Sequence, residues 1–434
     1  MSDSLLGAGS ARGRALAIAA TVVLLASTVA VGAAGLVADS GTDTAAAPVQ
    51  ASPDAFAATE NLSAANATLR GAAANDTAGW SVATAGDVNG DGVDDLIVGA
   101  PRNGSAGPNT GAAYIVYGPA NESSVNLTDA DVVLRGAASN DLAGWSVSTA
   151  GDVNGDGYAD VVVGAPYNDS TAVNAGAAYV VYGNESLPAT MNLTDADAVV
   201  TGSEANAFAG YDVSSLRRTN LSAGTNDTDA NATDASAVLV GAPGYNATDP
   251  LAEEAGEDPI QSDAGAAHLV AGPLSGSTNL SDADVTLTGE AAGEQVGFSV
   301  SDAGDVNNDT VPDVVVGAPD TDADETTPDA GAAYVLYGTS ELAGTFPVSE
   351  ADVTIAGEAA GDQAGWAVSS AGSGDVSCDG VDDLLVGAPG HDGGANDTGA
   401  AYVVSGASDL GDTVALDDAT ATFFGAGAGD EAGR

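Results

Sequence analysis

The sequence predicts an all-β fold, a β-propeller of four-stranded antiparallel blades, and three observations support this prediction. The block GDVNGDGYADVVVGAP at residues 151–166 recurs along the chain. Similar blocks begin at Gly86, Gly304 and Gly374, and a degenerate one precedes Gly241. Each repeat holds short runs rich in Val, Ala and Tyr that end at Gly or Pro, without helical spacing between them. Repeats that each contain several short strands are typical of propeller blades rather than helical solenoids.

One repeat has room for four strands, at residues 145–148, 161–163, 178–182 and 198–201, and Gly-Ala-Pro, Gly183 and Gly202 end the last three. The predicted blades span approximately residues 72–136, 137–202, 203–289, 290–358 and 359–425, and residues 426–434 begin a truncated next blade. Residues 67–71 are predicted to form the fourth strand of a blade whose first three strands are missing from the chain. Five whole blades and this single strand predict that the chain forms part of a six- or seven-bladed ring, with an open or strained ring as the alternative.

The composition excludes several partners. The chain has 8 basic residues, all arginine, against 62 acidic residues, and its formal net charge is −54. Such a charge repels phosphate and anionic lipid, which argues against nucleic acid as a partner. Acidic chains with few aromatic residues are often disordered, but here 44% of the residues are hydrophobic and fall into regular runs. We interpret the charge as a solvated coat suited to high salt, where the Debye length shrinks to about 3 Å at 1 M, and this composition resembles that of extreme halophiles.

The N-terminal segment, residues 1–37, predicts export. Arg12 and Arg14 precede an uncharged run over residues 15–37. The run is long enough to cross a bilayer core of about 30 Å as an anchor, and its small residues equally fit a cleaved signal peptide. Residues 38–60 read as a flexible linker and residues 61–434 as the propeller. The one cysteine, Cys378, excludes an internal disulfide.

Export makes the Asn-x-Ser/Thr triplets candidate glycosylation sites. A chain this rich in Asn, Ser and Thr also yields such triplets by chance. They begin at Asn61, Asn66, Asn75, Asn103, Asn121, Asn126, Asn168, Asn184, Asn192, Asn220, Asn226, Asn231, Asn246, Asn279 and Asn396.

A glycine followed by an aromatic residue opens every repeat, at Gly79, Gly144, Gly210, Gly297 and Gly365. A large ring at one place in each blade is interpreted as a wedge that packs blade against blade, because aromatic side chains dominate core burial. The alternative is a stacking platform for sugar.

The run GWSVSTAGDVNGDGYADVVVGAP, followed by GAAYVVYG, resembles the FG-GAP repeat of integrin alpha chains over roughly residues 61–434. Trp replaces the usual Phe in three repeats, and the third repeat is degenerate. The resemblance implies a propeller with calcium in the loop between the first two strands of several blades, and ligands on the opposite face. It implies a non-enzymatic calcium-binding protein, secreted or at the cell surface, that mediates adhesion or binds a protein ligand. The alternative is a carbohydrate-binding propeller or the targeting module of an exported glycan-acting enzyme.

The acidic loops supply the oxygens that Ca²⁺ prefers, at loop positions 1, 3, 5, 7 (a backbone carbonyl) and 9. Four repeats offer a full set, so about four structural Ca²⁺ ions are predicted. An acidic turn without metal is the alternative. The sets are Asp87, Asn89, Asp91, Val93 and Asp95; Asp152, Asn154, Asp156, Tyr158 and Asp160; Asp305, Asn307, Asp309, Val311 and Asp313; and Asp375, Ser377, Asp379, Val381 and Asp383.

The residue at loop position 6 is Gly in three repeats, which permits the positive φ of a sharp turn, whereas Thr310 should be strained there. An EF-hand requires Glu at position 12 before a helix, but Val98 and Val163 stand there within strands. In the third repeat Asp229 and Asn231 occupy positions 1 and 3, but Thr233 and Ala237 occupy positions 5 and 9, so no calcium is predicted.

The loops between the second and third strands must lie on the face opposite the calcium loops, because neighbouring strands are antiparallel. They span residues 102–110, 167–174, 244–263, 320–329 and 390–398. The hypothesis is that they contact the ligand, and the alternative for any single residue is a solvated loop suited to high salt. The third is the longest and carries Glu253, Glu254, Glu257, Asp258 and Asp263. No catalytic motif surrounds His268 or His391, so the protein is not expected to be an enzyme.

Overall fold

The computed structural model describes residues 67–119, 124–216, 236–248, 260–323, 327–339, 342–371, 375–393, 396–408 and 410–434. The described residues form strands and short 3₁₀ helices and contain no α-helix, which confirms the predicted all-β fold. No helix among them is long and apolar enough to cross a membrane. The predicted signal or anchor and the linker lie outside the described residues.

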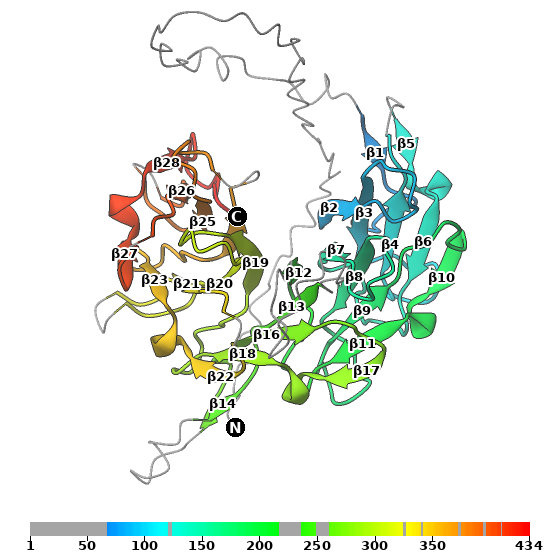
Figure 1. Ribbon diagram of the computed structural model, residues 1–434, viewed down its shortest axis with the longest axis horizontal. Coiled ribbons are helices and arrows are strands. Elements are labelled where there is room, and N and C mark those ends of the chain that lie inside the picture. Colours follow the sequence, from blue (N-terminus) through cyan, green and yellow to red (C-terminus); the bar gives the residue numbers. More distant parts are fainter. Residues whose placement is uncertain are drawn as a thin grey trace, which may run out of the picture.

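Each of five sheets contains four antiparallel strands in chain order, which confirms the predicted blade unit. They follow one another around an arc from β1 to β28 (Figure 1). Blade 1 is β2 (Val82–Gly86), β3 (Asp95–Ala100), β4 (Ala112–Val116) and β6 (Val132–Arg135); blade 2 is β7 (Val147–Gly151), β8 (Asp160–Ala165), β9 (Ala177–Val181) and β11 (Ala198–Thr201); blade 3 is β12 (Val213–Leu216), β13 (Ala237–Ala242), β16 (Ala266–Ala271) and β18 (Val285–Thr288); blade 4 is β19 (Ser299–Gly304), β20 (Asp313–Ala318), β21 (Ala332–Leu336) and β23 (Val353–Ala356); and blade 5 is β24 (Ala367–Ser370), β25 (Leu384–Ala388), β26 (Ala400–Val404) and β28 (Ala421–Phe424).

The first strand of blade 2 begins later than predicted. The sequence placed it at residues 145–148, whereas β7 begins at Val147. The reason is a turn before the strand, in which the amide of Trp145 donates to the carbonyl of Leu142 at 3.1 Å. The fourth strand, β11, has the predicted bounds.

A fifth strand joins each neighbouring pair of blades, and sequence reasoning missed it. A short 3₁₀ helix precedes the last strand of each blade, and the residues just before this helix pair in parallel with the last strand of the preceding blade. Leu193, for example, is fully buried in the 3₁₀ helix that follows β10. These strands are β5 (Val125–Asn126), β10 (Thr190–Asn192), β17 (Gly276–Asn279), β22 (Gly344–Pro347) and β27 (Thr413–Ala415), and the helices are Leu127–Asp129, Leu193–Asp195, Leu280–Asp282, Val348–Glu350 and Leu416–Asp418.

The predicted single strand at residues 67–71 is β1 (Leu69–Arg70). Within the described residues its only strand partner is β5 of blade 1, through a parallel pairing of Leu69 with Val125. It therefore occupies the place of a last strand in a blade that precedes blade 1 along the arc.

The hydrophobic core lies between blades. Ile97 and Ile115 of blade 1 share one buried cluster with Val161 and Val181 of blade 2, and equivalent clusters join the later blades. Glycine permits this close approach: a Cβ on Gly99 would lie 2.2 Å from the carbonyl oxygen of Gly144 in the next blade. This contact explains the glycines of both the Gly-Ala-Pro and the Gly-aromatic motifs.

The aromatic residues that follow these glycines form a continuous series. The ring centroids of Trp80, Trp145, Tyr211, Phe298 and Trp366 lie 4.8, 5.5, 4.9 and 4.6 Å apart in that order. Each ring thus contacts the ring of the next blade, as interpreted from the sequence.

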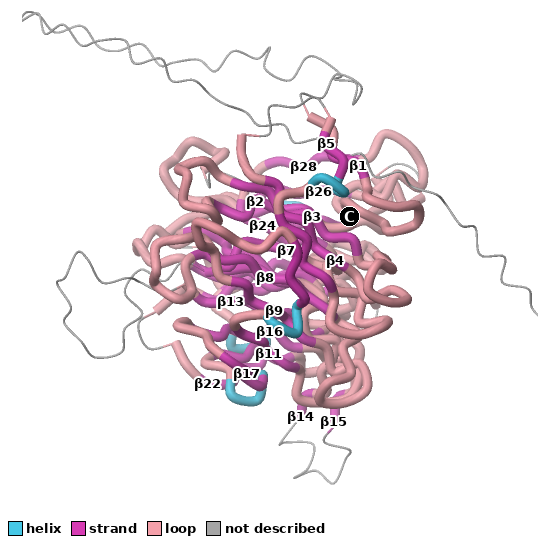
Figure 2. The backbone as a smooth tube through the Cα atoms, turned by 90° about the vertical axis from the view of Figure 1, so that its right-hand side faces the viewer, coloured by secondary structure: helices cyan, strands magenta, loops and turns pink. Residues whose placement is uncertain are grey.

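The loop between the second and third strands of blade 3 contains a short hairpin that the sequence did not reveal. Its strands are β14 (Ala247–Thr248) and β15 (Ile260–Gln261), and they project from the body of the molecule (Figure 2). Of the acidic residues predicted on this loop, Asp263 is described and Glu253, Glu254, Glu257 and Asp258 lie outside the described residues.

Candidate metal centres

The acidic loops follow a β-bulge at the end of the first strand. In blades 1, 2 and 4 the register shifts just before Gly86, Gly151 and Gly304, whose φ angles are 73°, 67° and 77°. A bulge with a left-handed glycine bends the strand and redirects the chain. The local sequence Ala-Gly-Asp therefore turns the backbone into the loop.

In blade 2 the loop closes around its own carboxylates. Oδ1 of Asp152 accepts from the amides of Gly155 and Asp156 at 2.7 and 3.0 Å, and Oδ2 accepts from Gly157 at 2.9 Å. Oδ1 of Asn154 accepts from the amide of Asp156 at 2.8 Å. Oδ1 of Asp156 accepts from the amide of Tyr158 at 3.0 Å. Positions 1, 3 and 5 thus turn toward the same small loop.

The same bonds recur in the other loops. In blade 1 the position 1 carboxylate, Asp87, accepts from Gly90, Asp91 and Gly92. In blade 4 the side chain of Asp305 accepts from Asp309 and Thr310. In blade 5 Asp375 accepts from Asp379 and Gly380, with Ser377 at position 3 close to it. Four predicted sets of side chains are therefore brought together in one geometry.

The position 9 aspartates lie beneath the loops and are fully buried at 0% exposure: Asp95, Asp160, Asp313 and Asp383. Oδ2 of Asp160 accepts from the amide of Val153 at 2.9 Å, and Oδ1 accepts from Gly183, at the end of the third strand, at 2.9 Å. The carboxylate therefore ties the loop to the strand beside it.

Burial raises the pKa of Asp160 to about 7, and the nearby carboxylates Asp156 and Asp152 raise it further, while two backbone amides oppose the shift. The pKa of Asp313 rises to about 7 for the same reasons. The ion pairs found among the described residues, His391 with Asp362 and Arg434 with Glu431, involve none of the loops. A buried carboxylate next to two others without a cationic side chain is the environment that a divalent cation would stabilise.

The donor set therefore fits Ca²⁺, which binds hard oxygen ligands. The predicted position 7 ligands, the carbonyls of Val93, Tyr158, Val311 and Val381, belong to residues whose amides donate to the position 5 aspartates. Metal binding by these carbonyls and by the side chains remains a prediction.

Among the acidic loops, the blade 4 loop has two non-glycine residues with positive φ. Loop positions 4 and 6 both adopt positive φ, and sequence reasoning predicted this only at position 6. Blades 1 and 2 place glycine at both positions, whereas blade 4 places Asn308 at φ 60° and Thr310 at φ 74°. A β-branched residue in this region is strained, as expected for Thr310.

The third blade differs at the buried position. Ala237 begins β13 where Asp95, Asp160 and Asp313 begin the equivalent strands. Asp229, Asn231 and Thr233 lie outside the described residues. The absence of the buried carboxylate agrees with the prediction that this loop does not bind calcium.

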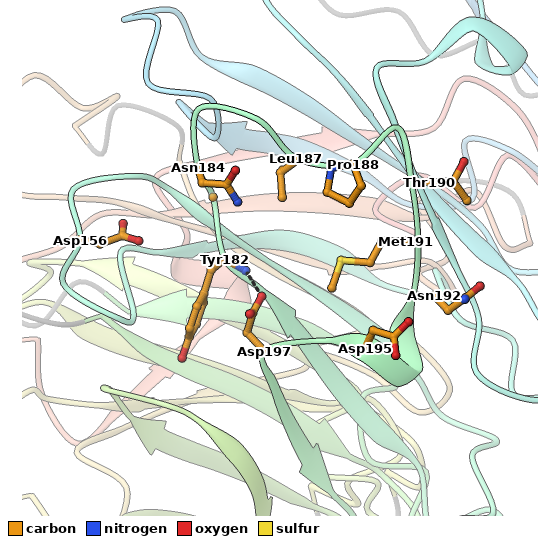
Figure 3. Close-up of a pocket in the computed structure, with 11 residues that line it drawn as sticks. Asp156, Tyr182, Asn184, Leu187, Pro188, Thr190, Met191, Asn192, Asp195 and Asp197 are labelled. Carbon is orange, nitrogen blue, oxygen red and sulfur yellow. Dashed lines mark hydrogen bonds between the residues drawn. The ribbon is translucent and has the colours of Figure 1, made fainter.

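A pocket of about 510 Å³ lies beside the blade 2 loop. Its polar lining includes Asp156, Asp195 and Asp197, and Leu187 and Met191 supply apolar surface (Figure 3). The connection from β9 to β11 forms most of it, so this pocket shares Asp156 with the predicted metal loop.

On the opposite side of blades 1 and 2, loops from two strand ends meet in a buried polar cluster that sequence reasoning missed. In blade 2, Nδ2 of Asn168 donates to Asp141 at 2.9 Å and to the hydroxyl of Tyr179 at 3.0 Å. In blade 1, Asn103 makes the same bonds to Asp76 and Tyr114. The Asn-x-Ser triplet, which both blades share, was the available signal, but by itself it predicts a glycosylation site.

Two of the candidate glycosylation sites are therefore excluded in the folded protein. Asn103 and Asn168 are 3% and 4% exposed, and their amide nitrogens are bonded within the protein. An attached glycan could not be accommodated at either position.

A second pocket on this side has a volume of about 260 Å³; it lies between blades 3 and 4 and is also lined by Tyr167 of blade 2. Tyr167, Phe208, Tyr211 and Phe298 supply aromatic surface, and Asp263 and Gln295 supply polar groups. The ring centroids of Tyr167 and Phe208 lie 5.3 Å apart.

The two histidines have different environments. His268 lies in β16 and is 2% exposed, and burial lowers its pKa to about 4. Its Nδ1 lies 3.0 Å from the hydroxyl of Thr286. His391 lies beside Asp362 at the end of blade 5, where it occupies the position of Asn168.

Comparisons with known proteins identify the repeat. The FG-GAP repeat matches residues 78–116, 143–181, 298–336 and 367–404, which fall in blades 1, 2, 4 and 5. Integrin alpha-PS2 of Drosophila melanogaster is 38% identical over 117 residues, which cover 25% of this chain and 8% of that protein. Integrin alpha-6 of Gallus gallus is 32% identical over 135 residues, covering 31% of this chain and 12% of that protein.

Phosphatidylinositol-glycan-specific phospholipase D of Bos taurus is 32% identical over 145 residues, covering 32% of this chain and 17% of that protein. The chain therefore spans less than a fifth of the length of these relatives.

Proposed function

Because this chain is an FG-GAP repeat protein that resembles integrin alpha chains, we propose that it is an exported, non-enzymatic propeller that binds an extracellular protein ligand and mediates adhesion. In this proposal calcium stabilises the blades, and the ligand is bound by the loops on the opposite face. The partner is a protein rather than a nucleic acid, since the net charge of −54 repels phosphate.

The observation that carries the calcium assignment is the buried aspartate at position 9. Asp95, Asp160, Asp313 and Asp383 are all fully buried, and each lies beneath a loop whose own carboxylates are held close together. A Ca²⁺ ion in each loop would offset the repulsion among these groups and join the first and second strands of the blade.

Calorimetric titration of the chelated protein with Ca²⁺, at fixed high salt, tests this assignment. We expect about four equivalents. Asp152→Asn in blade 2 should remove one of them, whereas Asp197→Asn, outside the loop in the same blade, should remove none. Equal stoichiometry in all three proteins would contradict the calcium sites.

The ligand face is tested separately. Replacing residues 246–262, which include the β14–β15 hairpin of blade 3, by the shorter loop of blade 2, residues 168–174, keeps both flanking strands. We expect the exchange to abolish capture of a protein partner from the producing cell surface while calcium binding is unchanged. Undiminished capture would refute this placement of the ligand contacts.

The pocket between blades 3 and 4 supports a second function, carbohydrate binding. Aromatic side chains stack on the apolar faces of sugars, and the polar groups of Asp263 and Gln295 can bond hydroxyls. One relative is named as a phospholipase D specific for phosphatidylinositol-glycan, so a role beside a glycan-acting enzyme belongs to this second proposal.

A glycan array separates the two functions. Binding to a defined glycan that Tyr167→Ala abolishes would favour the carbohydrate-binding function, with Tyr182→Ala, on the calcium side, as the control. No glycan binding, together with capture of a protein, would favour the adhesion function.

A further inference from the structure

The polar cluster of blade 5 has a different composition from that of blade 2. In blade 2 the amide of Asn168 satisfies both Asp141 and Tyr179. The amide nitrogen that makes both bonds does not titrate and does not ligate metals, so that cluster is fully explained as a structural element.

Blade 5 replaces this asparagine by His391, and it adds a second carboxylate, Glu358, where blade 2 has Ala137. Nδ1 of His391 lies 3.1 Å from Oδ2 of Asp362 and 3.3 Å from the hydroxyl of Tyr402. One ligand atom each from Glu358, Asp362 and His391 lies within 4.8 Å of the others.

The environment of this nitrogen favours a cation. When Nδ1 carries its lone pair, it faces the carboxylate of Asp362 at 3.1 Å without a proton between them, and a cation there could bind both groups. Two carboxylate groups stand at the same junction, and the hydroxyl of Tyr402 also bonds Glu358. A metal ion at this point would engage the nitrogen lone pair and both carboxylates together.

We propose that Glu358, Asp362 and His391 form a binding site for one divalent transition-metal ion of the Zn²⁺ class. Two carboxylate oxygens and one imidazole nitrogen are ligands that Zn²⁺ accepts, and three protein ligands leave a position for water or a partner's side chain. The imidazole distinguishes this site from the acidic loops, whose oxygen ligands suit Ca²⁺.

The protein holds the ligands at different depths. Asp362 is 3% exposed and its Oδ2 also accepts from the amide of Ala359 at 3.1 Å, which fixes the carboxylate. His391 is half-buried and Glu358 is exposed, so an ion can enter from the Glu358 side. Glu358 and Asp362 precede β24, and His391 follows β25, which places the site at the opposite end of β25 from the acidic loop.

Titration of the full chain with Co²⁺, in saturating Ca²⁺ and high salt, tests the proposal. Co²⁺ in a low-coordinate site with a nitrogen ligand absorbs visible light much more strongly than Co²⁺ in water, and Zn²⁺ added afterwards should abolish this absorption. We expect one equivalent at pH 7.5.

His391→Asn gives blade 5 the residue of blade 2 and should fold, yet it should weaken Co²⁺ and Zn²⁺ binding by more than the roughly 10- to 100-fold typical of an outer-shell partner. Glu358→Ala, at an exposed position, is a second test that does not depend on the buried cluster. The gain-of-site variant Asn168→His with Ala137→Glu should add a second equivalent in blade 2. Absence of Co²⁺ binding in the wild type, or unchanged binding in His391→Asn and Glu358→Ala, would overturn the proposal.

Discussion

Removal of calcium should make the stability of this protein fall as the pH rises from about 4 to 7. Asp160 and Asp313 have folded pKa values of about 7, against 3.8 for an ordinary aspartate. A folded pKa above the unfolded value means that the folded state binds the proton more tightly. The stabilisation by protons is therefore complete below about pH 4 and is lost as the pH rises through 7.

The magnitude follows from the shift. Each site contributes a slope of at most about 1.4 kcal/mol per pH unit, and a rise from 3.8 to about 7 corresponds to roughly 4 kcal/mol as an upper limit. Bound Ca²⁺ favours the charged carboxylates and removes this loss, because the ion competes with the proton. The stabilisation by calcium should therefore increase with pH over the same range.

Scanning calorimetry in chelator and in calcium, at one high salt concentration and at several pH values from about 4.5 to 8, measures this effect. Burial also raises the pKa of Asp95, Asp141 and Asp212. The double variant Asp160→Asn with Asp313→Asn isolates the two sites, because asparagine keeps the shape without the titration. In chelator this variant should show a smaller decline with pH than the wild type, and equal declines would refute the reasoning.

Three further predictions concern stability and are measured by denaturant unfolding in calcium. Thr310→Gly should stabilise the protein by about 1 kcal/mol, because it removes a β-branched residue at φ 74°. The reverse change in blade 2, Gly157→Thr, should destabilise the protein although a Cβ there meets no atom within 4 Å. Stabilisation by Gly157→Thr would contradict the argument from backbone strain. Asp212 accepts hydrogen bonds from side chains and amides of blades 2, 3 and 4. Asp212→Ala should therefore cost about 2 kcal/mol or more, and Asp212→Asn should cost less because one acceptor oxygen remains. Little loss in Asp212→Ala would contradict a link between the three blades. Trp145→Ala should cost about 3–5 kcal/mol because rings on both sides pack against it, whereas Trp80→Ala should cost less because Trp80 is 53% exposed; similar costs would show that the rings do not act as wedges.

The regular repeats made much of the fold predictable. A short run of alternating or continuous apolar residues between Gly and Pro is predicted as a β-strand from local sequence alone, and β11 matches its predicted bounds. The loop side chains were equally predictable, since alternate oxygen-bearing residues around a glycine define an acidic turn. Thr310 was expected to be strained, and its φ of 74° agrees.

Other features depend on contacts between residues far apart in the sequence. The fifth strand that joins the sheets of blades 1 to 4 has no local signature, because it comes from the next repeat along the chain. Asn168 appeared to be a glycosylation site, yet it is buried because Asp141 and Tyr179 meet it from other strand ends. The hairpin of β14 and β15 was also hidden, since two short pairs of residues carry little periodicity.

The sequence by itself determined the repeating blade, the acidic loop in four of the blades and the side of the blade on which that loop lies. Each of these is set within one repeat by local periodicity and turn chemistry. Only the tertiary structure decided that the position 9 aspartates are fully buried and that Glu358, Asp362 and His391 lie together. Burial and convergence of charge depend on how strand ends and neighbouring blades pack, and the order of residues along one repeat does not specify that packing.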